Sequence, residues 1–265
     1  MNSTPTPKTR LDFHNLPLIE AALRASLSEA VSVSYNVVNS IKNLLEPEFS
    51  TLSAPQQLEV APGFGPSPAE FGPSSLPGAV YGGHNAGLTV SVHPKVIVAR
   101  WIKQPGLSEM EYPRYPALRD ALWKAVDALA EGLGDDAFPG VAVVNMSYVN
   151  FLPATDPSSV VSNYFSEKAH LSLMDDARQI RKLEAGWSEH NRVDVRFALE
   201  QVTAKLGDSV HEGYRLTTAA GIRLAGSLNA QRALEEIHEY LQVFFLKLIS
   251  DHAKQEWMLK EVAND

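Results

Sequence analysis

Histidine is the side chain that most often carries protons and binds metals in proteins, and this chain contains eight histidines. They are His14, His84, His93, His170, His190, His211, His238 and His252. No two of them stand at metal-ligand spacing on one predicted element. His238 and His252 share the predicted C-terminal helix, but about 21 Å of helix axis separates them, too far for one ion to bridge. We interpret the histidines as surface or hydrogen-bonded core residues and predict no metal site.

The adjacent carboxylates of the chain stand in turn-like contexts. Asp135-Asp136 and Asp175-Asp176 follow predicted elements, where aspartate typically bonds to local backbone amides. The glycine-rich phosphate-binding motifs and the common nucleophile motifs are absent from the sequence. We therefore predict no catalytic residue and no cofactor. An enzyme remains an alternative only if the fold brings together dispersed groups such as Glu20, Asp251 and one histidine.

Glu20 stands out because it interrupts an apolar run, residues 18–23. In a strand, alternation places Glu20 and Arg24 on one face with Leu18 and Ala22. A carboxylate on such a face needs a partner or water, so two readings stay open. Glu20 either forms an ordinary surface ion pair or belongs to a binding site in a concave sheet.

A second set of polar side chains lies in the β-rich segment 141–152 and in the last helix. Tyr148 and Asn150 share one face of the predicted strand, and His238 lies on the helix expected to cover the sheet. Together with Glu20 they form the candidate polar contacts of a small-molecule pocket between the sheet and the C-terminal helix.

The bulk composition excludes several classes of protein. The chain has 265 residues, no cysteine and a formal net charge of −8. Without cysteine there is no disulfide, iron–sulfur cluster or cysteine nucleophile. The acidic balance disfavours nucleic-acid binding, which depends on Lys and Arg. The polar start and the absence of a long apolar run predict a cytoplasmic protein with no membrane segment.

Hydrophobic periodicity outlines the secondary structure. Residues 16–28 suit a strand or a short helix, 32–45 and 115–133 suit amphipathic helices, and 79–92 with 95–101 suit a hairpin. A central strand is expected at 141–152 and a short helix at 156–165. Strands follow at 171–174, 178–187, 193–202 and 213–224, and one long helix over 229–259 ends the pattern.

Residues 61–78 form a segment rich in proline and glycine that neither a helix nor a central strand tolerates. Phe64, Phe71 and Leu76 are spaced through it. The segment is either a plain surface loop or a loop that binds a partner protein through these apolar side chains.

These elements predict an α+β fold, with a bent and mostly antiparallel sheet packed against long helices. Residues 1–15 are expected to form a flexible leader and residues 16–265 a single domain. The order strand, helix, strands, helix occurs twice, which predicts two related halves at 16–135 and 136–265.

Three segments resemble one family of proteins. LPLIEAALRASL (16–27) resembles a P-x-I-x-E-A strand, VNMSYVNFLP (144–153) an R-Y-I-N strand, and LEEIHEYLQVFFLKLISDHAKQEW (234–257) a C-terminal H-E…I-[ST]-D helix. In this order they resemble a sporadically distributed family of uncharacterised bacterial proteins of similar length. Ser147 replaces the family's arginine before the tyrosine. The resemblance implies that 18–27 is the first strand, and a patchy distribution is typical of mobile defence or toxin–antitoxin loci.

The sequence thus favours a non-enzymatic cytosolic subunit or regulator that binds another protein. This interpretation depends on the missing catalytic motifs, the acidic balance, the aromatic-bearing loop and the resemblance. A small-molecule-binding protein is the main alternative.

Overall fold

A computed structural model describes residues 10–13, 17–46, 48–53, 78–84, 87–103, 112–134, 136–154, 156–167, 182–189, 192–206, 209–225, 229–257 and 259–262. Several predicted features lie outside the described residues. These are most of the leader, nearly all of the loop 61–78 with Phe64, Phe71 and Leu76, the strand at 171–174, and Asp175-Asp176.

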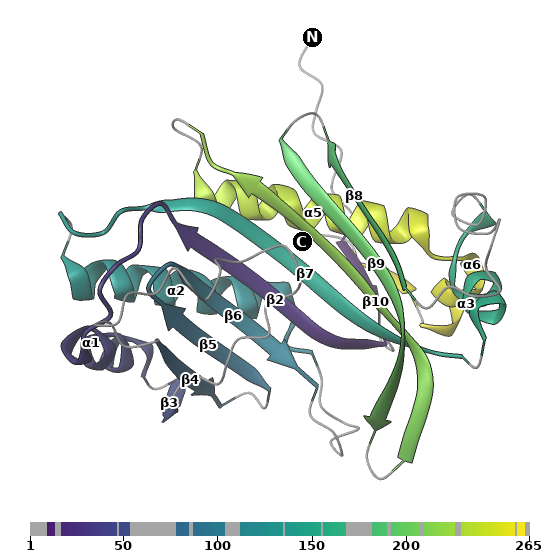
Figure 1. The fold of residues 1–265 in the computed structure, drawn as a ribbon, viewed down its shortest axis with the longest axis horizontal. Coiled ribbons are helices and arrows are strands. Elements are labelled where there is room, and N and C mark those ends of the chain that lie inside the picture. Colours follow the sequence, from purple (N-terminus) through teal and green to yellow (C-terminus); the bar gives the residue numbers. More distant parts are fainter. Residues whose placement is uncertain are drawn as a thin grey trace.

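The described elements fall into two series along the chain, which Figure 1 colours from purple to teal and from teal to yellow. The first series is β2 (Leu18–Leu27), α1 (Tyr35–Leu45), β3 (Phe49–Ser53), β4 (Ala79–Gly83), β5 (Leu88–His93), β6 (Val96–Ile102) and α2 (Arg114–Leu133). The second is β7 (Val141–Pro153), α3 (Pro157–Tyr164), β8 (Lys182–Glu189), β9 (Val193–Leu206), β10 (Ser209–Arg223) and α5 (Ala230–Leu248). Helix α6 (Asp251–Glu256) follows, and β1 (Arg10–Phe13) pairs with β11 (Leu259–Val262).

The large sheet has nine strands in the order β3-β4-β5-β6-β2-β7-β10-β9-β8, and its pairs are antiparallel. The first series of strands lies on one side of the β2–β7 pair and the second series on the other. The long strands bend and twist across the molecule (Figure 1). The predicted α+β class with a bent antiparallel sheet is confirmed.

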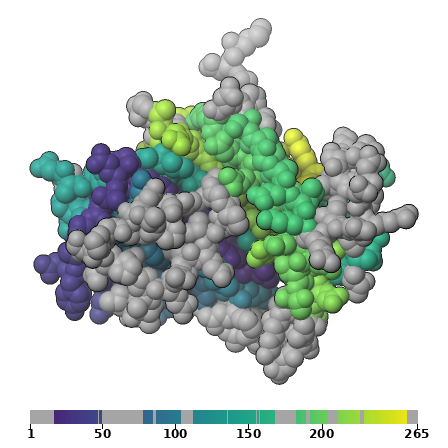
Figure 2. Space-filling view, in the orientation of Figure 1, coloured from purple at the N-terminus to yellow at the C-terminus, as the bar shows by residue number. Residues whose placement is uncertain are grey.

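Helices α2 and α5 pack on one face of the sheet, behind it in the view of Figure 1. One core cluster joins them to β2, β5, β6, β7 and β10, with Leu122 and Leu129 of α2 and Leu234 and Ile237 of α5 fully buried. A second cluster at the other end joins α3 and α6 to β9 and β10. The space-filling view shows the opposite side of the sheet, with the second half in green beside the first half in purple (Figure 2).

Strand β2 forms although its Ala, Leu and Glu content also suits a helix, because β6 and β7 pair with its two edges and most of its side chains are buried. The predicted side-chain alternation fails at its start. The pairing shifts between Leu18, opposite Asn150, and Glu20, opposite Val149. Leu18 therefore belongs to the helix-covered core, whereas Glu20 and Arg24 lie on the other face. The prediction that Leu18 shares a face with Glu20 is wrong.

The predicted long C-terminal helix is interrupted at Ile249, which has extended backbone angles and forms a β-bridge with Phe165. The Ser166 amide donates to Leu248 O and the Ser250 amide to Tyr164 O. These bonds replace the helical ones, and the Ser250 hydroxyl then caps α6 by accepting from the Ala253 amide. His238 and His252 therefore lie on different helices, so placing them on one helix was wrong.

Other boundaries also differ from the expectations. The predicted run 79–92 consists of two paired strands, β4 and β5. Strands β1, β3 and β11 had no counterpart in the sequence analysis, because short strands at an edge carry little periodicity. Strands β9 and β10 are longer than predicted, 14 and 15 residues, since each is supported by a neighbour along its length.

Helix α1 is held on the sheet by a buried tyrosine. Ser34 caps its first turn by accepting from the Val37 amide, and the Tyr81 hydroxyl of β4 donates to Val38 O at 3.0 Å. Burial raises the pKa of Tyr81 from 10.0 to about 12.

This shift predicts a loss of stability at alkaline pH. The folded state binds the Tyr81 proton more tightly than the unfolded chain, so the stabilisation is complete below pH 10 and falls as the pH rises to about 12. We expect Tyr81→Phe to reduce the slope of the unfolding free energy against pH in this window. Denaturant unfolding at pH 9 and pH 11 measures the slope. The exposed Tyr35→Phe is the control, and an equal effect of both changes would contradict the prediction.

Candidate functional site

The first candidate site is the sheet face opposite the helices, where Glu20 of β2 binds Arg100 of β6. Arg100 Nε donates to Glu20 Oε1 and Nη2 to Oε2, each at 2.8 Å. This two-bond geometry is the strongest that a carboxylate and a guanidinium form. Both side chains are largely buried, 27% and 21% exposed, so the pair is less screened than a surface ion pair.

Arg24 lies next along β2 on the same face and is only 7% exposed. Burial lowers the pKa of Arg24, the charge of Glu20 raises it, and the charge of Arg100 lowers it. The three charged groups therefore interact with one another across two strands.

Asn145 of β7 lies opposite Arg24 in the β2–β7 register. The residue is 9% exposed, and its Oδ1 atom is buried without a hydrogen-bond partner. A buried acceptor without a donor costs about 1–3 kcal/mol. Gly221 of β10 lies across from Asn145, and a Cβ at position 221 would overlap Asn145 Oδ1. Glycine is thus the residue that leaves room for this carbonyl.

The polar residues predicted to share a pocket with Glu20 lie on the opposite face of the sheet. Tyr148 packs against the core under α2 and α5, and Asn150 is buried with an unpartnered Oδ1. The His238 ring stacks on Tyr115 with centroids 3.7 Å apart. The structure thus gathers Tyr148 and His238 around Tyr115 and separates both from Glu20. Pleating sends alternate side chains to opposite faces, and the bulge before Glu20 decides which face it joins.

A layer of tyrosines lies between the helices and the sheet. Burial is the main cause that raises the pKa values of Tyr112, Tyr115 and Tyr148. For Tyr115 the charge of Glu235 raises the pKa further, and for Tyr148 its nearness to Tyr112 does so. These hydroxyls therefore stay protonated near neutral pH.

Asp251, the other carboxylate weighed for an enzymatic site, begins α6 and is bound to Lys254 at 2.7 Å. Helix α6 belongs to the second core cluster on the helix-covered side, so the fold does not bring Asp251 to Glu20. Within the described parts of the chain, no group of three or more His, Asp or Glu side chains is placed to hold a metal ion.

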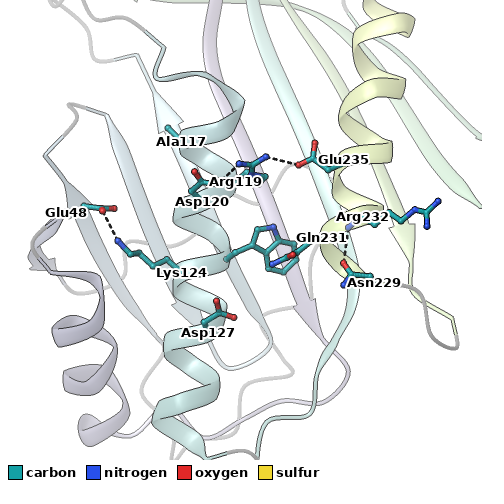
Figure 3. A pocket seen from close by; sticks show the side chains of 11 residues that line it. Glu48, Ala117, Arg119, Asp120, Lys124, Asp127, Asn229, Gln231, Arg232 and Glu235 are labelled. Atoms are coloured by element: carbon teal, nitrogen blue, oxygen red, sulfur yellow. Dashed lines mark hydrogen bonds and ion pairs between the residues drawn. The ribbon is translucent and has the colours of Figure 1, made fainter. Parts of the chain in front are cut away.

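The second candidate site is a groove of about 900 Å³ between α2 and the start of α5 (Figure 3). Eleven residues line it, of which only Ala117 and Trp123 are apolar. The polar lining is Glu48, Arg119, Asp120, Lys124, Asp127, Asn229, Gln231, Arg232 and Glu235. The sequence analysis did not identify this groove, because its lining comes from three segments that approach only when both helices dock on the sheet.

Of the three basic side chains that line the groove, two form ion pairs with carboxylates. Arg119 binds Asp120 at 2.8 Å and Glu235 at 3.1 Å, and Lys124 binds Glu48 at 2.7 Å. In Figure 3 the Arg232 side chain extends away from the groove. Asp127 has an exposed side chain and no ion pair within the described ranges. The groove therefore presents a net negative character to a ligand.

The Glu20–Arg100 pair generates a prediction about stability. We expect Glu20→Gln and Arg100→Gln each to lower the free energy of unfolding by about 2 kcal/mol, because each leaves a largely buried charge without its partner. The double variant should lose less than the sum of the two single changes. Urea unfolding of the four proteins measures this coupling, and strictly additive losses would show that the pair contributes nothing.

Helices of the described chain contain no segment long and apolar enough to cross a membrane. No protein-family model matches the chain, and no curated protein matches it. Among solved structures, it is similar to the substrate-free duplicated taurocyamine kinase from Schistosoma mansoni, with 11% identity and a TM-score of 0.39 over 89% of this chain. The chain spans a third of the length of that protein, 33%. A similarity of this size does not identify a function.

Proposed function

We propose that this protein is a cytosolic, non-enzymatic interaction subunit that binds a basic segment of a partner protein in the groove between α2 and α5. The observation that carries the proposal is the exposed carboxylate of Asp127, which has no ion pair within the described ranges, whereas the other three carboxylates of the groove are paired with Arg119 or Lys124. Of the charged lining residues, Glu48, Asp120, Asp127 and Glu235 are acidic and Arg119, Lys124 and Arg232 are basic. The net charge of −8 adds a long-range attraction for a basic partner.

The side chains along α2 suit a lysine or arginine of the partner. Asp120, Trp123 and Asp127 are spaced three and four residues apart, which places them along one side of the helix. Trp123 itself is buried in the core cluster, so the exposed carboxylates of Asp120 and Asp127 are the groups that a cation of the partner would meet. The exposed ion pairs at the rim contribute little stability to the fold itself, so their value lies in the selection of a partner.

The proposal keeps the regulatory role and the cytosolic location expected from the sequence. The absence of cysteine fits a reducing compartment. A mobile defence or toxin–antitoxin locus is a setting in which such a subunit would act, and that setting rests on the family resemblance alone.

The test places a photo-crosslinking amino acid at position 127 of the full chain, expressed in the cells that naturally contain it. We expect a single partner protein to crosslink through a segment rich in Lys or Arg, as identified by mass spectrometry. A crosslinked segment without basic residues, or no site-specific crosslink, would refute the proposal.

A charge-reversal pair tests the same contact quantitatively. Asp127→Lys should weaken the affinity for the crosslinked partner at least about tenfold, because it places a cation against the basic segment. Glu212→Lys makes the same change of charge at an exposed position of β10 and should leave the affinity within about twofold. Equal losses in both variants would indicate general electrostatics instead of a docked segment.

A further inference from the structure

The outer edge of β8 is open to solvent. Strand β8 is the last strand of the large sheet on the side of the second series, and among the described strands only β9 pairs with it (Figure 1). Ala185 and Gly186, at the centre of the strand, are both exposed. Because these residues have little or no side chain, their exposure leaves the backbone groups of the free edge accessible to another strand.

This edge lacks the features that usually prevent strands from pairing at the border of a sheet. Its pairing with β9 runs from Lys182 to Glu189 without a shift, so no bulge turns the edge away. The segment KLEAGWSE contains no proline. Its first two charges, Lys182 and Glu184, bind each other at 3.3 Å. A regular edge of this kind can add a further antiparallel strand.

An apolar surface adjoins the open edge on the side of α5. Trp187 of β8 is 36% exposed, and its ring centroid lies 5.3 Å from that of Phe244 of α5. Phe244 in turn stacks on Tyr240, and Val243, the neighbour of Phe244, is 51% exposed. Alternation places Ala185 on the same face of β8 as Trp187. Exposed aromatic side chains grouped in this way are typical anchors of protein interfaces.

The sequence of β8 is complementary to itself in one register. When two copies of a strand pair about a two-fold axis, one residue lies opposite its own copy. An axis at Ala185 places Leu183 opposite Trp187 on both sides of the axis, which gives two apolar pairs. An axis at Glu184 would place two carboxylates opposite each other, which is destabilising. An axis at Gly186 would lose the pairs of Leu183 with Trp187.

We propose that β8 is the interface of a symmetric dimer, in which the β8 strands of two copies pair antiparallel about Ala185. On the other face of the strands Lys182 lies opposite Ser188, and Glu184 lies opposite Gly186, so no like charges face each other directly. The two large sheets then form one continuous sheet. This surface does not include the lining of the groove between α2 and α5, and the dimer does not depend on the interaction proposed there.

Single cysteines test the pairing and its register, because the native chain contains no cysteine. We expect the full chain to have twice the mass of one chain, 29.0 kDa, in light scattering at micromolar concentration. Ala185→Cys should form a disulfide-linked dimer on mild oxidation, since residue 185 lies opposite its own copy within the reach of a disulfide. Ser188→Cys is the matched control on the same exposed strand. Its copy lies about 20 Å away, so it should stay reduced. A monomeric mass, or equal disulfide yields at both positions, would overturn the proposal.

Opposite charges at position 185 provide a second test that does not depend on oxidation. Ala185→Glu and Ala185→Lys each place like charges opposite each other, so each variant alone should dimerise at least tenfold more weakly. An equimolar mixture of the two should recover the dimer, which a variant that failed to fold could not do. A mixture that stays monomeric contradicts the pairing of position 185 with itself. A photo-crosslinking amino acid at this position should link two copies of the chain in cells, and a crosslink to a different protein alone would show that the edge accepts a strand of that protein instead of a second copy.

Discussion

The structure depends on the antiparallel pairing of β2 with β7. These strands join the first series, β3 to β6, to the second, β8 to β10, and no other ladder in the described sheet connects the two series. Because both strands lie at the centre of the sheet, their register fixes which side chains face the helices and which face away. The shift at the start of β2 directs Glu20 to one face and Leu18 to the other. A single bulge thus determines the composition of the candidate site.

The two faces of the sheet have different physical characters. The face under α2 and α5 is an apolar core whose polar side chains include tyrosines, an amide, Thr218 and a stacked histidine. The opposite face carries charged side chains on its central strands, including a guanidinium that is nine-tenths buried. Burying charge costs free energy unless it is paired, and the Glu20–Arg100 pair meets part of this cost.

The outer surface of the helix layer, in contrast, carries exposed ion pairs. Its ion pairs link α2 to α5 through Arg119 and Glu235, and α2 to the start of β3 through Lys124 and Glu48. Exposed pairs of this kind add little to stability but define a pattern of charge that a partner can match. The groove and the opposite sheet face are therefore chemically independent candidate sites on the two sides of one layered fold.

The sequence by itself determined the class of fold and most of the elements. The apolar stripe of 115–133 and the β-rich segment 141–152 predicted α2 and β7, since their patterns report the face that each element buries. It also singled out Glu20, an acid within an apolar run. Only the tertiary structure decided the partners of Glu20, because Arg100 comes from a strand 80 residues away whose position depends on strand order. The break in the helix at Ile249 likewise could not be predicted from the local sequence, because it is caused by hydrogen bonds to the backbone of residues 164–166. Local propensity favoured a continuous helix there, and long-range hydrogen bonds prevailed.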